Sequence, residues 1–99
     1  MAHKIISWDV RATYTGKISL KSGQEGEYKL KWDQSIDNCI IDGVKYIDIS
    51  GTLELSISAI RPSVSECRVG IVNCTGKTIE LDGSVSNEII TVYICVRYK

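Results

Sequence analysis

The chain has 99 residues, of which 43% are hydrophobic and 24% are charged, and its twelve Lys and Arg balance twelve Asp and Glu. This length fits a single domain, residues 1–99, that buries a core without a metal or a disulfide framework. A formal charge of zero argues against nucleic-acid binding, because nucleic-acid-binding surfaces are basic. The apolar content argues against disorder, and no apolar run is long enough for a membrane span. We therefore expect a soluble domain with no nucleic-acid partner and no membrane insertion.

The apolar residues are of the kinds that favour β-sheets. Fifteen Ile and eight Val stand against five Leu, three Ala and no Phe, and β-branched side chains fit a pleated sheet better than a helix. The N-terminus leads directly into an alternating pattern, without an apolar stretch of signal-peptide length. This pattern favours a cytoplasmic protein, with a mature secreted form carrying an added Met as the alternative.

The first part of the chain predicts a hairpin. Residues 6–20 alternate between apolar and polar, which is typical of a strand with one buried face. Gly16 breaks the inner row, and a Gly inside a long strand marks a bulge or bend, so we expect the strand to change sheets there. After a turn cluster at residues 22–27, the inner row resumes with Tyr28, Leu30 and Trp32.

The middle of the chain predicts a second hairpin and a second corner. Residues 39–46 contain Asp42-Gly43, a pair that supplies the positive φ angles of a type I′ turn. A further alternating strand covers residues 47–59, where Gly51 occupies an inner-row position like that of Gly16.

The last third of the chain completes the prediction of the fold. Short strands are expected at residues 67–71 and 79–81, and a longer one at 89–98. Frequent turn signals and the absence of a helical period predict an all-β fold with about eight strands and no significant helix. The expected architecture is a small antiparallel β-sandwich, jelly-roll or Greek-key like, or a partly open barrel.

Few residues suit catalysis or metal binding. The single His, His3, lies at the terminus, so no well-placed imidazole is available to activate a Ser or Cys nucleophile. Asp33, Asp37 and Asp42 fall around one loop, but their spacing differs from that of an EF-hand, and a solvated loop is the expected interpretation. We expect no enzyme, no cofactor and no metal.

The four cysteines, Cys39, Cys67, Cys74 and Cys95, include no C-x-x-C pair, which argues against a zinc site. An extended strand after Cys67 would place Cys74 about 23 Å away, too far for a disulfide. Two pairings stay open, Cys39–Cys67 with Cys74–Cys95 and Cys39–Cys74 with Cys67–Cys95, beside the favoured alternative of four reduced thiols. Asn73-Cys74-Thr75 also fits an N-glycosylation pattern.

A loop after the first hairpin provides a candidate ligand site. Trp32 ends a strand, and an indole beside Asp, Gln and Asn is a mixture that suits sugars, with an apolar face for the ring and polar groups for the hydroxyls. Packing in the core is the competing interpretation for this Trp. The candidate ligand-binding residues are Trp32, Asp33, Gln34, Asp37 and Asn38.

Two surfaces are candidate interfaces. The outward row of the first hairpin carries five basic residues that would meet an anionic partner, or would simply solubilise that face and discourage edge pairing. The last strand is apolar on both faces, so Ile89 and Tyr93 need cover from a loop or from a second subunit, and we expect an oligomer interface there. The basic residues are Arg11, Lys17, Lys21, Lys29 and Lys31.

Together these patterns predict a non-enzymatic, lectin-like binding or interaction module that recognises a protein or glycan surface as a homo-oligomer. The alternative is a structural or assembly subunit, for example of a virion or surface layer, built from opposed charged faces. A secreted inhibitor or toxin-like domain is the third possibility.

Overall fold

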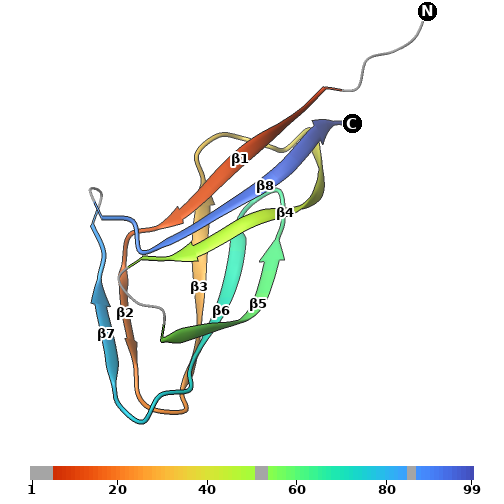
Figure 1. Cartoon of the computed structure of the whole chain (residues 1–99). Coiled ribbons are helices and arrows are strands. Elements are labelled where there is room, and N and C mark those ends of the chain that lie inside the picture. The colour runs from red at the N-terminus through yellow and green to blue at the C-terminus, as the bar shows by residue number, and fades with distance from the viewer. Residues whose placement is uncertain (1–5, 51–53, 85–86) are drawn as a thin grey trace, which may run out of the picture.

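The structure is a computed structural model that describes residues 6–50, 54–84 and 87–99 (Figure 1). Its described residues form strands and loops without a helix, which confirms the predicted all-β fold. The eight strands are β1 (Ser7–Tyr14), β2 (Lys17–Leu20), β3 (Glu25–Trp32), β4 (Cys39–Ile49), β5 (Leu55–Pro62), β6 (Cys67–Asn73), β7 (Ile79–Asp82) and β8 (Ile90–Tyr98).

Six strands form one antiparallel sheet in the order β4-β8-β1-β3-β6-β5, and β2 and β7 form a small second sheet. The large sheet curls until its edge strands β4 and β5 approach one another, so that it is nearly closed, as in a partly open barrel (Figure 1). Its interior is filled by alternate side chains of the strands, because successive residues point to opposite faces. Those of β8 are completely buried: Ile90, Val92, Ile94 and Val96.

Gly16 is the corner that the alternating pattern predicts. β1, which precedes it, belongs to the large sheet, while β2, which follows it, pairs with β7. The ring of Tyr14 lies over the glycine, and a Cβ there would come within 2.5 Å of the Tyr14 hydroxyl. That hydroxyl donates a hydrogen bond to the carbonyl of Lys17 at 2.9 Å and thereby spans the bend. The second predicted corner, Gly51, lies outside the described residues.

The first hairpin forms with a different pairing from the one expected. β1 and β3 are antiparallel neighbours, in register at Ala12–Trp32 and Thr13–Lys31. The residues of β2, however, pair with β7 and not with β3. The bend at Gly16 takes β2 out of the large sheet, and a partner sixty residues later in the chain then satisfies its backbone groups.

The predicted second hairpin is wrong. Residues 39–49 form one strand, β4, which pairs with β8 along its whole length. Gly43 does not have the positive φ that a type I′ turn requires. Register shifts of one residue at Asp42 and at Lys45 absorb the irregular sequence as β-bulges, and the Asp42 carboxylate accepts a hydrogen bond from Arg97 Nε at 2.9 Å.

Candidate functional site

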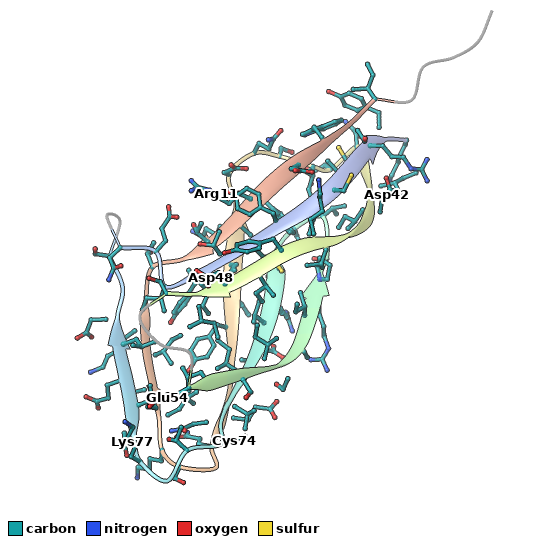
Figure 2. The ribbon with its side chains drawn as sticks, viewed as in Figure 1. Arg11, Asp42, Asp48, Glu54, Cys74 and Lys77 are labelled. Carbon is teal, nitrogen blue, oxygen red and sulfur yellow. The ribbon has the colours of Figure 1, made fainter. Side chains whose placement is uncertain are left out.

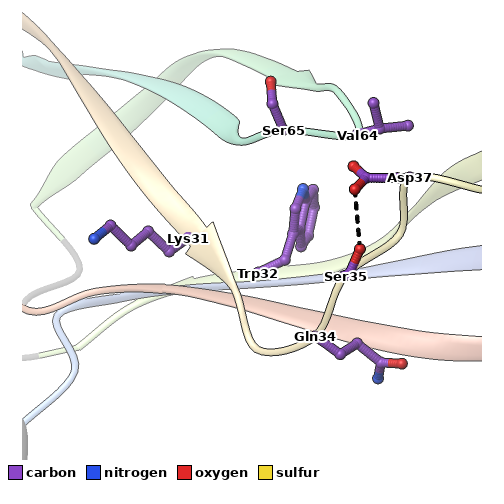
Figure 3. Close-up of a pocket in the computed structure, with 7 residues that line it drawn as sticks. All are labelled: Lys31, Trp32, Gln34, Ser35, Asp37, Val64 and Ser65. Carbon is purple, nitrogen blue, oxygen red and sulfur yellow. Dashed lines mark hydrogen bonds between the residues drawn. The ribbon is translucent and has the colours of Figure 1, made fainter.

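A pocket of about 430 Å³ opens between the loop of residues 33–38 and the turn that joins β5 to β6 (Figure 3). Three of the five predicted ligand-binding residues line it, namely Trp32, Gln34 and Asp37. The backbones of the other two hold the ends of the loop: the Asp33 amide donates to the Arg11 carbonyl at 2.9 Å, and the Asn38 carbonyl accepts from Lys99 at 3.2 Å. The full lining is Lys31, Trp32, Gln34, Ser35, Asp37, Val64 and Ser65.

The middle of this loop is anchored in the core. Ile36 is completely buried, and its carbonyl accepts a hydrogen bond from the Cys39 amide at 3.0 Å. Because an apolar side chain fixes the centre of the loop and backbone bonds fix its two ends, the polar side chains on either side of Ile36 project from a held backbone. Ser35 and Asp37 therefore face the pocket together, and the Ser35 hydroxyl donates to Asp37 Oδ2 at 3.2 Å (Figure 3).

Trp32 combines the two roles that its sequence position allows. Its side chain is half-buried and packs against the core, while its ring also lines the pocket. The indole Nε1 donates to the Ser63 carbonyl at 2.8 Å. Ser63 is itself held by its turn, because its amide and its hydroxyl both donate to the Glu66 carbonyl, at 2.8 and 2.9 Å. These hydrogen bonds fix the orientation of the indole.

The polar side chains of the pocket keep part of their hydrogen-bonding capacity. Gln34 Oε1 accepts a hydrogen bond from the Trp8 indole at 3.3 Å, which leaves its amide N–H groups with no partner in the described part of the chain. Asp37 uses one oxygen for Ser35 and keeps the other. With the Trp32 ring and the 40% exposed Val64 beside them, the pocket offers a donor, an acceptor and an apolar surface.

Sequence reasoning missed the far wall of the pocket. Val64 and Ser65 lie more than thirty residues after Trp32 and reach it only because β3 pairs with β6. The sequence around Pro62 marks the end of a strand, but nothing local links this turn to the Trp32 loop. The missing information is strand order, which single-sequence periodicity does not contain.

The five predicted basic residues are distributed over three strands and a turn. Arg11 on β1 forms an ion pair with Glu88 at 3.2 Å (Figure 2). Lys17 lies on β2 in the second sheet, and Lys21 in the turn that follows it. The exposed Lys29 and Lys31 share β3 in the large sheet.

Lys29 belongs to a row of cations across the outer face of the large sheet. It lies directly opposite Arg68, which in turn lies opposite Arg61. Glu27 contacts both arginines, at 3.2 Å from Arg61 and 3.6 Å from Arg68. Glu66 contacts Arg68 Nε at 2.7 Å, and this hydrogen bond lowers the pKa of the Glu66 carboxyl. Carboxylates therefore compensate most of the repulsion that like charges in register would cause.

The predicted interface residues have different environments. Ile89 is only 2% exposed and is covered by the chain itself. Tyr93 points outward from β8 and is half-buried against Tyr46 of β4, with the ring centroids 6.1 Å apart. Tyr46 is 53% exposed, so the aromatic surface that remains open belongs mainly to a residue that the sequence did not single out.

All four cysteines are free thiols in the structure. Cys39 and Cys67 are buried and Cys74 is exposed, while burial raises the pKa of the Cys67 thiol to about 11. Such a thiol stays protonated at neutral pH and is a poor nucleophile. Cys74 lies on the connection from β6 to β7, at the end of the barrel farthest from Asp42 (Figure 2).

The N-glycosylation pattern falls on a buried residue. Asn73 is 0% exposed, and its amide nitrogen donates to the carbonyls of Leu20 and Lys77, both at 2.8 Å. Its side-chain oxygen accepts from the Thr75 amide at 2.9 Å and from the Thr75 hydroxyl at 2.6 Å. The nitrogen that a glycan would modify is therefore inaccessible and fully bonded in the folded chain.

Across the described ranges, no three His, Cys, Asp or Glu residues come together in a way that suits a metal ion. The predicted loop acids are separated: Asp37 bonds to Ser35, and Asp42 to Arg97. His3 lies outside the described residues.

No helix in the described part of the chain is long and apolar enough to cross a membrane. No protein-family model, curated protein or solved structure matches this chain.

Proposed function

We propose that the protein is a non-enzymatic binding module that takes a carbohydrate into the pocket beside Trp32. The observation that carries this proposal is an indole ring, held in one orientation by Ser63, next to polar side chains with unused hydrogen-bonding atoms. A sugar ring has C–H faces that pack on an aromatic surface and hydroxyls that both donate and accept hydrogen bonds. The pocket contains the complement of each.

The pocket favours a neutral sugar. One cation, Lys31, and one carboxylate, Asp37, line it, so these two charges cancel. An acidic sugar would gain from Lys31 but would meet Asp37 as a like charge. Because the Trp32 ring is already fixed, binding does not require the conformational freedom of this side chain to be lost.

A titration with neutral mono- and disaccharides tests the proposal. The two Trp residues give separate indole N–H signals in a proton–nitrogen correlation spectrum, and we expect the Trp32 signal to shift on binding. Trp32→Ala should abolish binding, and Asp37→Ala, a change in an exposed loop, should weaken it without unfolding the chain. Tyr46→Ala, on the outer face, is the matched aromatic control and should bind normally. A folded Asp37→Ala variant with unchanged affinity, or no response to any saccharide, would overturn the proposal.

A second candidate function is assembly with further copies of the chain. The exposed Tyr46 ring contacts Tyr93 at a tilted angle, and the edge strand β4 also carries the exposed Ile40 and Val44. Aromatic side chains that remain exposed on a folded chain are enriched at interfaces between proteins. Light scattering tests this candidate: the wild type should be dimeric or larger, and Tyr46→Asp should give a folded monomer.

Ionic strength separates this apolar interface from the assembly of opposed charged faces that the sequence also allows. A contact centred on Tyr46 should persist as salt is added, whereas contacts between charged faces should dissociate. A wild-type chain that is monomeric at all concentrations would exclude both forms of assembly.

A further inference from the structure

We infer that the carbohydrate site continues beyond the pocket to Trp8 and Tyr98, so that the ligand is an oligosaccharide chain and not a single sugar. This inference rests on the proposed function. It starts from an aromatic pair that the pocket does not include: the rings of Trp8 on β1 and Tyr98 at the end of β8 lie 4.7 Å apart. Trp8 is half-buried, and Tyr98 is 65% exposed.

Gln34 connects this aromatic pair to the pocket. Its side chain lines the pocket and also accepts the hydrogen bond from the Trp8 indole at 3.3 Å. Figure 3 shows that it points away from the Trp32 ring, on the side of the loop where β1 passes. Its free amide N–H groups therefore lie between the two aromatic surfaces, where a chain of sugars passing from one to the other would meet a donor.

The spacing of the two aromatic surfaces sets the kind of ligand. Trp32 is directly opposite Ala12 in the pairing of β1 with β3, and Trp8 lies four residues before Ala12 on the same face of β1. Four residues of a strand span about 13 Å. One sugar ring stacked on Trp32 does not extend that far, so only a chain of linked sugars contacts both surfaces.

The ring surface of the Trp8–Tyr98 pair favours the same ligand. The Trp8 indole N–H already donates its hydrogen bond to Gln34. A ligand at the Trp8–Tyr98 pair therefore meets the ring surfaces and not the indole donor. Repeated sugar units present the same alternation of C–H faces and hydroxyls at each step. An aromatic surface at each end with the Gln34 amide between them matches that repeat.

A length series of neutral oligosaccharides tests the inference. In the wild type we expect affinity to rise from the monosaccharide to the tetrasaccharide, and the Trp8 indole signal to shift only with the longer ligands. Tyr98→Ala, at an exposed position, should lower the affinity for long chains about two- to tenfold and leave the affinity for short ligands unchanged. Tyr46→Ala is the control and should change neither the affinity for long chains nor the affinity for short ligands.

The outcomes distinguish this inference from the proposal on which it rests. If short saccharides bind at Trp32 but affinity does not grow with length, and Tyr98→Ala has no effect, the extension is wrong and the pocket proposal stands. If no saccharide of any length shifts the Trp32 signal, the pocket proposal fails and the extension fails with it. Loss of short-ligand binding in Tyr98→Ala would show that this residue only supports the fold of the pocket.

Discussion

The two ends of the barrel differ in how completely their polar side chains are hydrogen-bonded. At the end where β6 finishes, Asn73 uses both donors and its acceptor oxygen, two of these bonds being with Thr75. At the end formed by residues 33–38, Gln34 and Asp37 each have one engaged oxygen and further capacity that no group in the described structure uses. Both ends consist of polar turns, and the local sequence gives them a similar appearance.

The difference follows from burial. A buried amide must find partners inside the protein, because an unsatisfied group costs about 1–3 kcal/mol of stability. The exposed loop side chains have water as an alternative partner and can exchange it for the hydroxyls of a ligand. A saturated polar group is therefore evidence for a structural role, whereas unsaturated groups beside a fixed aromatic ring are evidence for binding.

The largest effect is expected from Asn73→Ala. The change removes the Asn73 donor from the Leu20 carbonyl and the acceptor of the Thr75 amide, while the Lys77 carbonyl keeps the Thr75 hydroxyl as its second donor at 2.9 Å. At about 1–3 kcal/mol for each unpaired buried group, the loss is a large share of the about 5–15 kcal/mol that stabilises a small domain. Urea unfolding followed by circular dichroism should show a transition midpoint far below that of the wild type.

Asn87→Ala is the matched control for this variant. Asn87 is exposed, and its side-chain nitrogen donates a single hydrogen bond to the Asp82 carbonyl at 3.1 Å. Removing one exposed hydrogen bond should cost about 1 kcal/mol or less. Equal stabilities of the two Ala variants would contradict the structural role assigned to the Asn73 network.

A smaller loss of stability is expected from Trp32→Ala. A fully buried aromatic replaced by Ala costs about 3–5 kcal/mol, but part of the Trp32 ring faces the pocket, so we expect less than about 3 kcal/mol. The same denaturation experiment, with carbohydrate binding measured in parallel, separates the two roles of the ring. A full core penalty would indicate that little of the ring is available to a ligand.

The parts of the fold that the sequence predicts are those determined by local pattern. β1 and the corner at Gly16 follow from alternation and from one glycine, because one buried face constrains every second residue. β4 is different. Asp42-Gly43 has the composition of a turn, yet the strand continues through it, pairs with the whole of β8 and accommodates Asp42 as a β-bulge. Composition alone does not distinguish a bulge from a turn, since both need a residue that tolerates irregular backbone.

In the candidate site, too, local pattern predicts some residues and strand pairing brings in the others. Trp32, Gln34 and Asp37 are close in sequence and were found together, whereas Val64, Tyr98 and Trp8 reach this end of the barrel only through strand pairing. The separation of Lys17 from Lys29 is equally non-local, because it depends on β2 pairing with β7. Sequence pattern thus predicts which face a residue takes, and the order of strands decides which residues meet.

A pH-dependent loss of stability is expected from Cys67. Its pKa is raised to about 11 by burial, from an ordinary value near 9, so the unfolded chain loses its thiol proton before the folded chain does. Stability from this difference is complete below pH 9 and disappears as the pH rises to about 11. Two pKa units correspond to at most about 2.7 kcal/mol. Urea unfolding at pH 8 and pH 11 should show a smaller decrease for Cys67→Ala than for the wild type, and equal decreases would contradict the assignment.

The smallest effect on stability is expected from Ser35→Ala, which removes an exposed hydroxyl from the loop and with it the hydrogen bond to Asp37 Oδ2 at 3.2 Å. Surface substitutions of this kind usually change stability by less than about 0.5 kcal/mol, so the melting temperature should stay within a few degrees of the wild type. Carbohydrate affinity should nevertheless fall, because Asp37 loses the neighbour that orients its carboxylate toward the pocket. Asn73→Ala would thus weaken the fold, and Ser35→Ala only the binding. Unfolding of the Ser35→Ala chain, or carbohydrate binding with full affinity, is the opposite outcome. Either result would contradict the distinction between the Asn73 end, where hydrogen bonds are complete, and the end formed by residues 33–38, where free hydrogen-bonding groups serve binding.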